Sequence, residues 1–243
     1  MIRAKVAPLE AGERTLDTSL GHYLARVLRL RAGDGFVAFD PSTSREADAV
    51  VVSVNHDTVR VSLGAPRAAV TTTRREVIFV QGLAKGDKCD AIVRDATELG
   101  ATRIVFAHTE RSMVKLDAMR AAARTQRWMR IAEEAARQCG RSDAPALRVF
   151  DEWSSALGSV DEHAARFCLY ERATEPLGRP LLAALSGEGA IAFAAGPEGG
   201  LADAEVAHAR AAGWAVASLG DLTLRAETVA AAVLGAVRIW SAL

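Results

Sequence analysis

From Glu76 onward, short apolar runs alternate with amphipathic segments, and this alternation constrains the fold more than any other feature. The apolar runs predict strands over residues 77–81, 103–107, 147–150, 166–170, 190–195 and 215–219. The segments between them predict helices over residues 88–99, 117–139, 177–185, 203–212 and 227–240. Strands that alternate with helices imply a parallel sheet covered on both faces. We therefore expect an α/β fold for this part of the chain.

The first 70 residues follow a different pattern, that of a small barrel-like β domain with one early helix. Asp17, Thr18 and Ser19 are candidate N-caps for a helix over residues 20–30, which Gly33 ends. Strands are predicted over residues 35–39, 47–54 and 59–63, with turns at 40–44 and 55–57. Residues 65–73 have no apolar period and predict a linker. We therefore place one domain at residues 1–70 and a second at residues 74–243.

The charges are balanced overall but unevenly distributed along the chain. Net charge is zero, which argues against a general polyanion binder. Residues 71–150 carry 15 basic and 10 acidic residues, whereas residues 151–243 carry 6 and 12. A basic middle segment can provide a positive footprint for nucleic acid, and scattered solvated charge fits the same counts.

Several functional classes lack their signatures in this sequence. No apolar run is long enough to span a membrane, and the N-terminus has no apolar secretory segment. The three cysteines and five histidines have the spacing of neither a disulfide framework nor a metal site. The glycine motifs of dinucleotide and phosphate binding and of serine hydrolases are absent. We expect a cytoplasmic protein with no metal and no membrane partner.

Two glycine-containing loops near the C-terminus are the best candidates for a ligand site, because each follows a predicted strand. The first spans residues 196–200 and the second residues 219–228. In open α/β sheets, ligands bind at the carboxyl ends of strands. Glycines let the backbone approach a ligand that a β-carbon would block. The sequence therefore predicts one pocket built largely from main chain.

Some polar side chains near these loops have two interpretations. Glu198 is a general base or an N-cap for the helix after Gly200, and capping is favoured because a carboxylate stabilises a helix N-terminus. Arg225 and Glu227 form a structural ion pair or steer a substrate. Cys139 is a nucleophile or, in better agreement with its place before a helix C-cap, an apolar filler.

A basic helix is predicted to end near residue 139, and its exposed end carries Gln138 and Arg141. Arginines recur along this helix at positions 120, 124, 127, 130 and 137. This pattern is consistent with nucleic-acid binding or with an ordinary solvated face.

Taken together, these segments resemble the RsmE family, methyltransferases of the SPOUT superfamily that act on 16S ribosomal RNA. The residues that carry the resemblance are His22–Arg29, Lys85–Lys88, Glu98–Ala101, Glu110–Ser112, Gln138–Arg141, Gly196–Gly200 and Leu224–Thr228. They occur in the right order across nearly the whole chain. The family usually has a basic residue at the position of Leu222, so this chain departs from the pattern there.

The resemblance implies a PUA-like β-barrel for RNA, followed by a C-terminal SPOUT domain with a deep trefoil knot. It implies a homodimer that binds S-adenosylmethionine in the knot and methylates N3 of one uridine, position 1498 of 16S ribosomal RNA, in the small ribosomal subunit. The cofactor-binding residues would be Gly196, Pro197, Glu198, Gly199, Gly200, Leu219, Gly220, Leu222, Leu224 and Thr228. The RNA-binding residues would be Arg26, Arg29, Lys85, Arg111, Gln138 and Arg141.

For catalysis, we expect Arg225 to stabilise negative charge on the uracil carbonyls and Glu227 to orient Arg225. Three alternatives stay open. In the first alternative, the chain is a SPOUT enzyme with another RNA target, a ribose 2′-oxygen or a guanine. In the second, it is a non-catalytic RNA-binding assembly factor. In the third, it is a small-molecule α/β enzyme, which leaves the N-terminal β domain unexplained.

Overall fold

The computed structural model describes residues 2–40, 43, 45–55, 58–69, 75–114 and 116–240. Its contacts divide the chain into two compact units. The N-terminal unit comprises Met1–Thr71 and Ala136–Asp143, and the C-terminal unit comprises Thr72–Ala135 and Ala144–Leu243. Residues 70–73 of the expected linker, and parts of the two expected turns at 40–44 and 55–57, lie outside the described residues.

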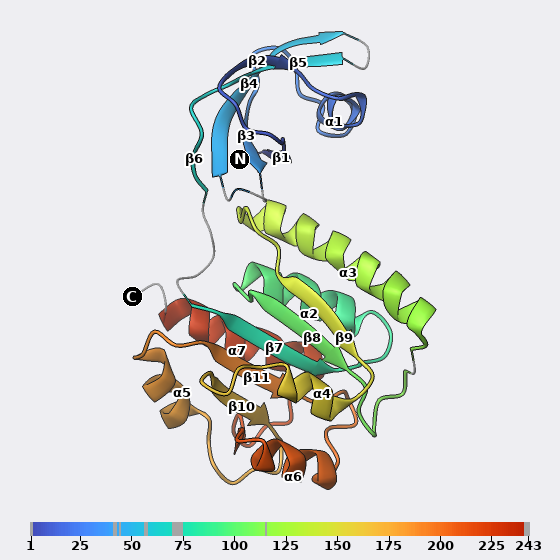
Figure 1. Cartoon of the computed structure of the whole chain (residues 1–243), viewed down its shortest axis with the longest axis vertical. Helices are drawn as coiled ribbons and strands as arrows, with labels where there is room; N and C mark the ends of the chain where they lie inside the picture. The colour runs from blue at the N-terminus through green and yellow to red at the C-terminus, as the bar shows by residue number, and fades with distance from the viewer. Residues whose placement is uncertain are drawn as a thin grey trace. The chain divides into compact units, whose positions relative to one another are not determined.

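The N-terminal unit contains a mixed sheet in the order β1-β3-β4-β5-β2, with β6 paired to β4 (Figure 1). Its strands are β1 (Arg3–Lys5), β2 (Gly12–Thr15), β3 (Gly35–Asp40), β4 (Arg45–Asn55), β5 (Thr58–Leu63) and β6 (Arg67–Ala68). Only β1 and β3 pair in parallel within this sheet as described. The sequence analysis missed β1, β2 and β6, because two to four residues are too few to show an alternating pattern.

The early helix differs from its prediction at both ends. It consists of α1 (Thr18–His22) and a π-helical turn, η1 (Tyr23–Val27). Asp17 is the N-cap, as predicted, and its carboxylate accepts a hydrogen bond from the amide of Leu20 at 2.9 Å. The predicted end at Gly33 is wrong. The turn closes earlier, where Arg29 has a φ of 56° and the amide of Leu30 donates to the carbonyl of Leu24.

In the C-terminal unit, six parallel strands form a sheet in the order β12-β10-β11-β7-β8-β9. They are β7 (Val77–Gly82), β8 (Arg103–Ala107), β9 (Ala146–Phe150), β10 (Ala165–Leu169), β11 (Ile191–Ala195) and β12 (Ala215–Ala217). The helices are α2 (Lys88–Glu98), α3 (Ala118–Cys139), α4 (Trp153–Gly158), α5 (Gly178–Leu185), α6 (Asp203–Ala211) and α7 (Ala226–Trp240). The predicted parallel α/β sheet is confirmed, whereas α4 was not predicted.

Alternate side chains of these strands enter two separate apolar clusters. Phe79, Phe106 and Phe193 belong to a cluster with residues of α2, α3, α5 and α7. Ile78 and Val105 belong to a cluster with residues of α4 and α6. Figure 1 shows α2 and α7 on one face of the sheet and α4 and α6 on the other. Both faces are therefore covered, which explains why the strands read as continuous apolar runs.

Glycines close α2 and α3 as predicted, with φ values of 99° at Gly100 and 88° at Gly140. Asp90 of α2 links the two helices, because its carboxylate accepts from the indole of Trp128 at 2.9 Å and pairs with Arg127 at 2.5 Å. In the part of the chain that the structure describes, no helix is long and apolar enough to cross a membrane.

Candidate functional site

A cavity of about 640 Å³ lies at the carboxyl ends of three neighbouring strands, β12, β10 and β11. The loop after β11 and the loop after β12 provide most of its lining. The prediction that these two loops build one pocket is confirmed. The pocket is formed because β10 lies between β11 and β12 in the sheet, so the three strands end side by side.

The loop after β11 has two positions that disfavour a side chain, Gly196 for lack of space and Gly200 mainly for its backbone conformation. A β-carbon on Gly196 would lie 2.8 Å from the carbonyl carbon of Gly200 and 2.9 Å from the nitrogen of Leu201. Gly200 has a φ of 70°, which other residues rarely adopt, and a β-carbon there would lie 2.9 Å from Oε1 of Glu171. The loop therefore presents backbone rather than side chains to the cavity.

The end of β7 supports this loop from within the sheet. Gln81 is fully buried, and its amide Nε2 donates to the carbonyl of Gly196 at 2.8 Å. A β-carbon on Gly82 would lie 2.6 Å from Cδ of Pro197, so Pro197 packs directly on the backbone of β7. Neither residue was predicted as part of the site, because their proximity depends on the pairing of β7 with β11.

Glu198 connects the same loop to the start of α2. Its carboxylate accepts from the backbone amide of Lys85 at 3.0 Å and pairs with Nζ of Lys88 at 2.9 Å. Burial opposes ionisation of this carboxyl, but the bonds from Lys88 and from backbone amides outweigh it and lower the pKa of Glu198. An N-cap role for Glu198 is wrong. The following helix begins only at Asp203, and Glu205 provides its capping contact by accepting from the amide of Ala202 at 2.8 Å.

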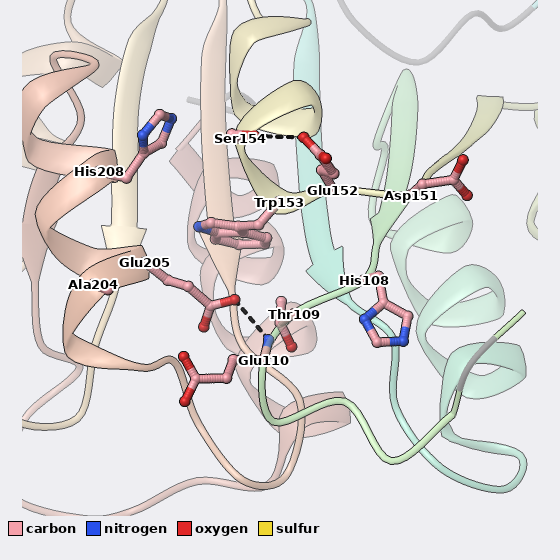
Figure 2. A pocket seen from close by; sticks show the side chains of 10 residues that line it. All are labelled: His108, Thr109, Glu110, Asp151, Glu152, Trp153, Ser154, Ala204, Glu205 and His208. Carbon is pink, nitrogen blue, oxygen red and sulfur yellow. Dashed lines mark hydrogen bonds between the residues drawn. The ribbon is translucent and has the colours of Figure 1, made fainter.

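The loop after β8 supports loop 196–200 from the other side. Arg111 is exposed, and its Nη1 donates to the carbonyl of Gly199 at 3.1 Å. The backbone next to Arg111 is in turn held by Glu205, whose Oε1 accepts from the amide of Glu110 at 2.8 Å (Figure 2). Loop 196–200 is thus fixed by contacts from the ends of both β7 and β8.

A second, open cavity of about 510 Å³ lies next to this contact. Figure 2 shows the side chains that line it. Its titratable lining residues are His108, Glu110, Asp151, Glu152, Glu205 and His208. Among the described residues, no group of three or more His, Cys, Asp or Glu side chains is arranged to hold a metal ion. This cavity lacks the main-chain cradle of the first one.

The loop after β12 contributes Leu219, Gly220, Leu222, Leu224 and Arg225 to the first cavity. Leu222 is 80% exposed and Arg225 is also exposed. The backbone carbonyl of Arg225 accepts from the amide of Val229 at 3.0 Å, but no hydrogen bond or ion pair joins its side chain to another residue within the described parts of the chain.

Glu227 and Thr228 do not line the cavity. The reason is that α7 begins at Ala226, so Ala226 and Val229, three residues apart, face the cavity, and the two residues between them point elsewhere. Thr228 therefore lies outside the cavity lining, and its cofactor contact stays a prediction. One carboxylate oxygen of Glu227 is buried and has no hydrogen-bond partner among the described residues.

The sequence analysis missed seven of the residues that line the cavity. They are Lys88, Leu169, Tyr170, Glu171, Ala195, Leu201 and Val229. Tyr170 and Glu171 follow β10, so the rule that ligands bind at carboxyl ends of strands applies to them as well. What the sequence lacks is the strand order that places β10 between the two glycine loops.

The residues predicted to bind RNA fall in both units. Arg26 and Arg29 are exposed in the N-terminal unit, and Lys85 is exposed in the C-terminal unit. Gln138 is exposed, as expected for a helix end. Arg141 is not: it is 3% exposed and pairs with Asp143 at 2.9 Å. The expectation that Arg141 sits on an exposed end is wrong: α3 closes at Gly140, the amide of Arg141 donates back to the carbonyl of Ala136 at 2.8 Å, and the side chain is buried.

Two family models match this chain. Residues 71–238 match the RNA methyltransferase domain, and residues 16–64 match the RNA methyltransferase PUA domain. A Synechocystis protein named ribosomal RNA small subunit methyltransferase E is 32% identical over 97% of this chain and 76% of the relative. The protein of the same name from Mycobacterium tuberculosis is 31% identical over 92% of this chain and 85% of the relative.

A solved structure from Neisseria gonorrhoeae has the same fold. It is described as a ribosomal RNA small subunit methyltransferase E bound to S-adenosyl methionine, and it matches with a TM-score of 0.85. Its sequence is 26% identical, and the match covers 98% of this chain and 97% of that chain. From the domain match, the identity to these relatives and the shared fold, we conclude that this chain belongs to the ribosomal RNA small subunit methyltransferase E family.

Proposed function

We propose that this protein transfers a methyl group from S-adenosylmethionine to N3 of a single uridine, position 1498 of 16S ribosomal RNA, in the small ribosomal subunit. The observation that carries the proposal is the main-chain-lined cavity at the ends of β12, β10 and β11. Residues 1–70 would form a PUA-like barrel that binds RNA, and residues 74–243 would form the knotted SPOUT domain. The protein would act as a homodimer in the cytoplasm.

The cavity fits a ligand that is recognised by backbone groups. Side chains are disfavoured at Gly196 and Gly200, and the loop between them is held by Gln81, Lys88 and Arg111. A rigid loop has little freedom to lose when it binds a ligand, which favours affinity. The residues that would hold S-adenosylmethionine are those of the two loops, 196–200 and 219–224, together with the end of β10.

The reaction requires alignment and stabilisation of charge more than covalent catalysis. S-adenosylmethionine supplies a methyl group that is already activated on a sulfonium. Uracil N3 becomes a good nucleophile when its proton leaves, and negative charge then spreads to the ring carbonyls. Arg225 lines the cavity and has no ion-pair partner among the described residues, so its guanidinium is available to stabilise that charge. Alignment of two reactants can contribute about 7–11 kcal/mol to the lowering of the barrier.

Glu198 is a poor candidate for the base that removes the N3 proton. Its pairing with Lys88 and its lowered pKa make it a weak proton acceptor at neutral pH. Solvent takes the proton in the mechanism we propose. Glu227 would act on Arg225 only indirectly, since no hydrogen bond or ion pair connects the two in the described residues.

RNA binding would use exposed cations of both units: Arg26 and Arg29, then Lys85 and Arg111, with Gln138 as a polar contact. Arg141 would instead maintain the local structure through Asp143. Aromatic residues make up only 5% of the chain, so phosphate contacts rather than base stacking should dominate. Affinity for RNA should therefore fall steeply with salt.

Mass spectrometry of ribosomal RNA from a strain that lacks the gene tests the reaction. One methyl group on a uridine should disappear and return when the gene is restored. Loss of a ribose or guanine methyl group would instead identify another RNA target. Calorimetry with S-adenosylmethionine tests the non-catalytic alternative, which predicts no binding. Methylation of a small molecule with unchanged RNA would support the small-molecule enzyme.

A further inference from the structure

Glu171 places a negative charge at the wall of the cavity. It follows β10, the central strand of the three that end there, and it lines the cavity together with both loops. Its carboxylate packs against the backbone of Gly200, where a β-carbon would come within 2.9 Å of Oε1. The absent side chain of Gly200 therefore leaves the space that this carboxylate occupies.

The residues on either side of Glu171 are anchored to the same atom. Oδ1 of Asp203, at the start of α6, accepts from the hydroxyl of Tyr170 at 2.7 Å and from Nη2 of Arg172 at 2.6 Å. The bond from Tyr170, and then the charge of Arg172, lower the pKa of Asp203, so it stays ionised at neutral pH. Both sequence neighbours of Glu171 thus contact one carboxylate at the start of α6.

The charge of Glu171 is not neutralised by a neighbour. Among the described residues that line the cavity, the charged ones are Lys88, Glu171, Glu198 and Arg225. Lys88 and Glu198 pair with each other at 2.9 Å and largely cancel. No hydrogen bond or ion pair joins Glu171 to another described residue. Arg225 is the remaining cation, and its proposed partner is the uracil.

We propose that Glu171 makes the cavity selective for the positively charged methyl donor over the neutral product. This inference rests on the proposed function. The sulfonium of S-adenosylmethionine becomes a neutral thioether in S-adenosylhomocysteine, and the rest of the two molecules is the same. A carboxylate anywhere in a cavity of this size attracts the extra positive charge, whichever end of the ligand it touches. Glu171 is exposed, so we expect a preference for the donor of roughly fivefold, at the upper end of what an exposed charge pair contributes.

The test is calorimetry of both ligands with the full chain, comparing the native protein with Glu171→Gln. The amide keeps the shape and removes the charge. The ratio of the two dissociation constants, product over donor, should fall about fivefold, mainly because the donor binds more weakly. Glu188→Gln is the matched control. Glu188 is exposed and precedes β11, at the amino-terminal ends of the strands and so away from the cavity. This variant should therefore leave the ratio unchanged.

Two results with the variant would overturn the inference. An unchanged ratio with both ligands weakened would show that Glu171 contacts a group common to both, such as a ribose hydroxyl. An unchanged ratio with unchanged affinities would exclude any role. Failure of both ligands to bind the native protein would instead refute the cofactor assignment in the proposed function. If Glu171→Gln does not fold, the ratio in the native protein is measured at rising salt. Screening should lower that ratio, and a flat response would contradict the proposal.

Discussion

The rigidity of loop 196–200 leads to a strong prediction for Gly196→Ala. The new methyl group would lie 2.8 Å from the carbonyl carbon of Gly200, 2.9 Å from the nitrogen of Leu201 and 3.0 Å from its Cγ. These contacts are far inside van der Waals distance, and two of them are with backbone. Leu201 has little freedom to move away, because it is 1% exposed and packs in the apolar cluster under α4 and α6.

Overpacking of this kind typically costs about 1–3 kcal/mol of the free energy of unfolding. For a domain of this size, each kcal/mol lowers the melting temperature by about 2–4 °C. If the loop instead moves to relieve the clash, the cavity wall is displaced by several tenths of an ångström. A misplacement of about 1 Å can reduce a reaction rate about a hundredfold. We therefore expect a smaller shift of the cavity wall to weaken the binding of S-adenosylmethionine, on the order of tenfold, with a lower melting temperature.

Thermal unfolding and calorimetry measure these two effects, and Gly189→Ala is the control. A β-carbon on Gly189 would meet nothing within 4 Å, and its φ lies outside the left-handed region. The control should be neutral or stabilised by up to about 1 kcal/mol, because alanine restricts the unfolded chain. If Gly196→Ala matched the control in both melting temperature and affinity, the argument that packing of this loop shapes the cavity would be refuted.

Four further changes test other parts of the site. Arg225→Ala should reduce turnover at least about a hundredfold while the donor still binds, and near-normal turnover would remove this residue from the mechanism. Arg29→Gly should raise the free energy of unfolding by about 1 kcal/mol, since Arg29 has a φ of 56°. The same change should weaken RNA binding and reduce the slope of its salt dependence by about one. Unchanged RNA affinity would exclude Arg29 from RNA binding. The pKa of Glu198 is lowered in the folded state, so its pairing with Lys88 stabilises the protein above the ordinary carboxyl pKa of 4.5, and this contribution is lost as the pH falls through the folded-state value. Glu198→Gln should therefore flatten the fall in melting temperature in acid, and an identical acid profile would count against the ion pair. Cys139→Ala should keep full activity, because attack by N3 needs no thiol, whereas inactivity with the fold intact would favour a cysteine mechanism.

Much of the C-terminal unit follows from local sequence patterns. The strands of the parallel sheet and α2, α3, α5, α6 and α7 lie within two residues of their predicted bounds. This agreement arises because burial periodicity and glycine C-caps are properties of neighbouring residues. Helix α4 was not predicted, because its six residues are too few to establish a helical period.

The short strands of the N-terminal unit are a different case. β1, β2 and β6 acquire their structure by pairing with β3, β5 and β4, which are longer and were predicted. Their own residues carry little β-signal. An edge strand of this kind is recognisable only once its partner is in place.

Two glycine loops that follow strands are visible in the amino-acid sequence, and they are enough to predict a main-chain-lined pocket. The position of β10 between the strands that carry those loops, which places Glu171 at the pocket, is visible only in the folded protein. The same is true of the support that Gln81 gives to Gly196 and of the burial of Arg141. Burial periodicity and glycine turns depend on neighbouring residues, whereas the order of strands depends on the packing of segments far apart in the chain.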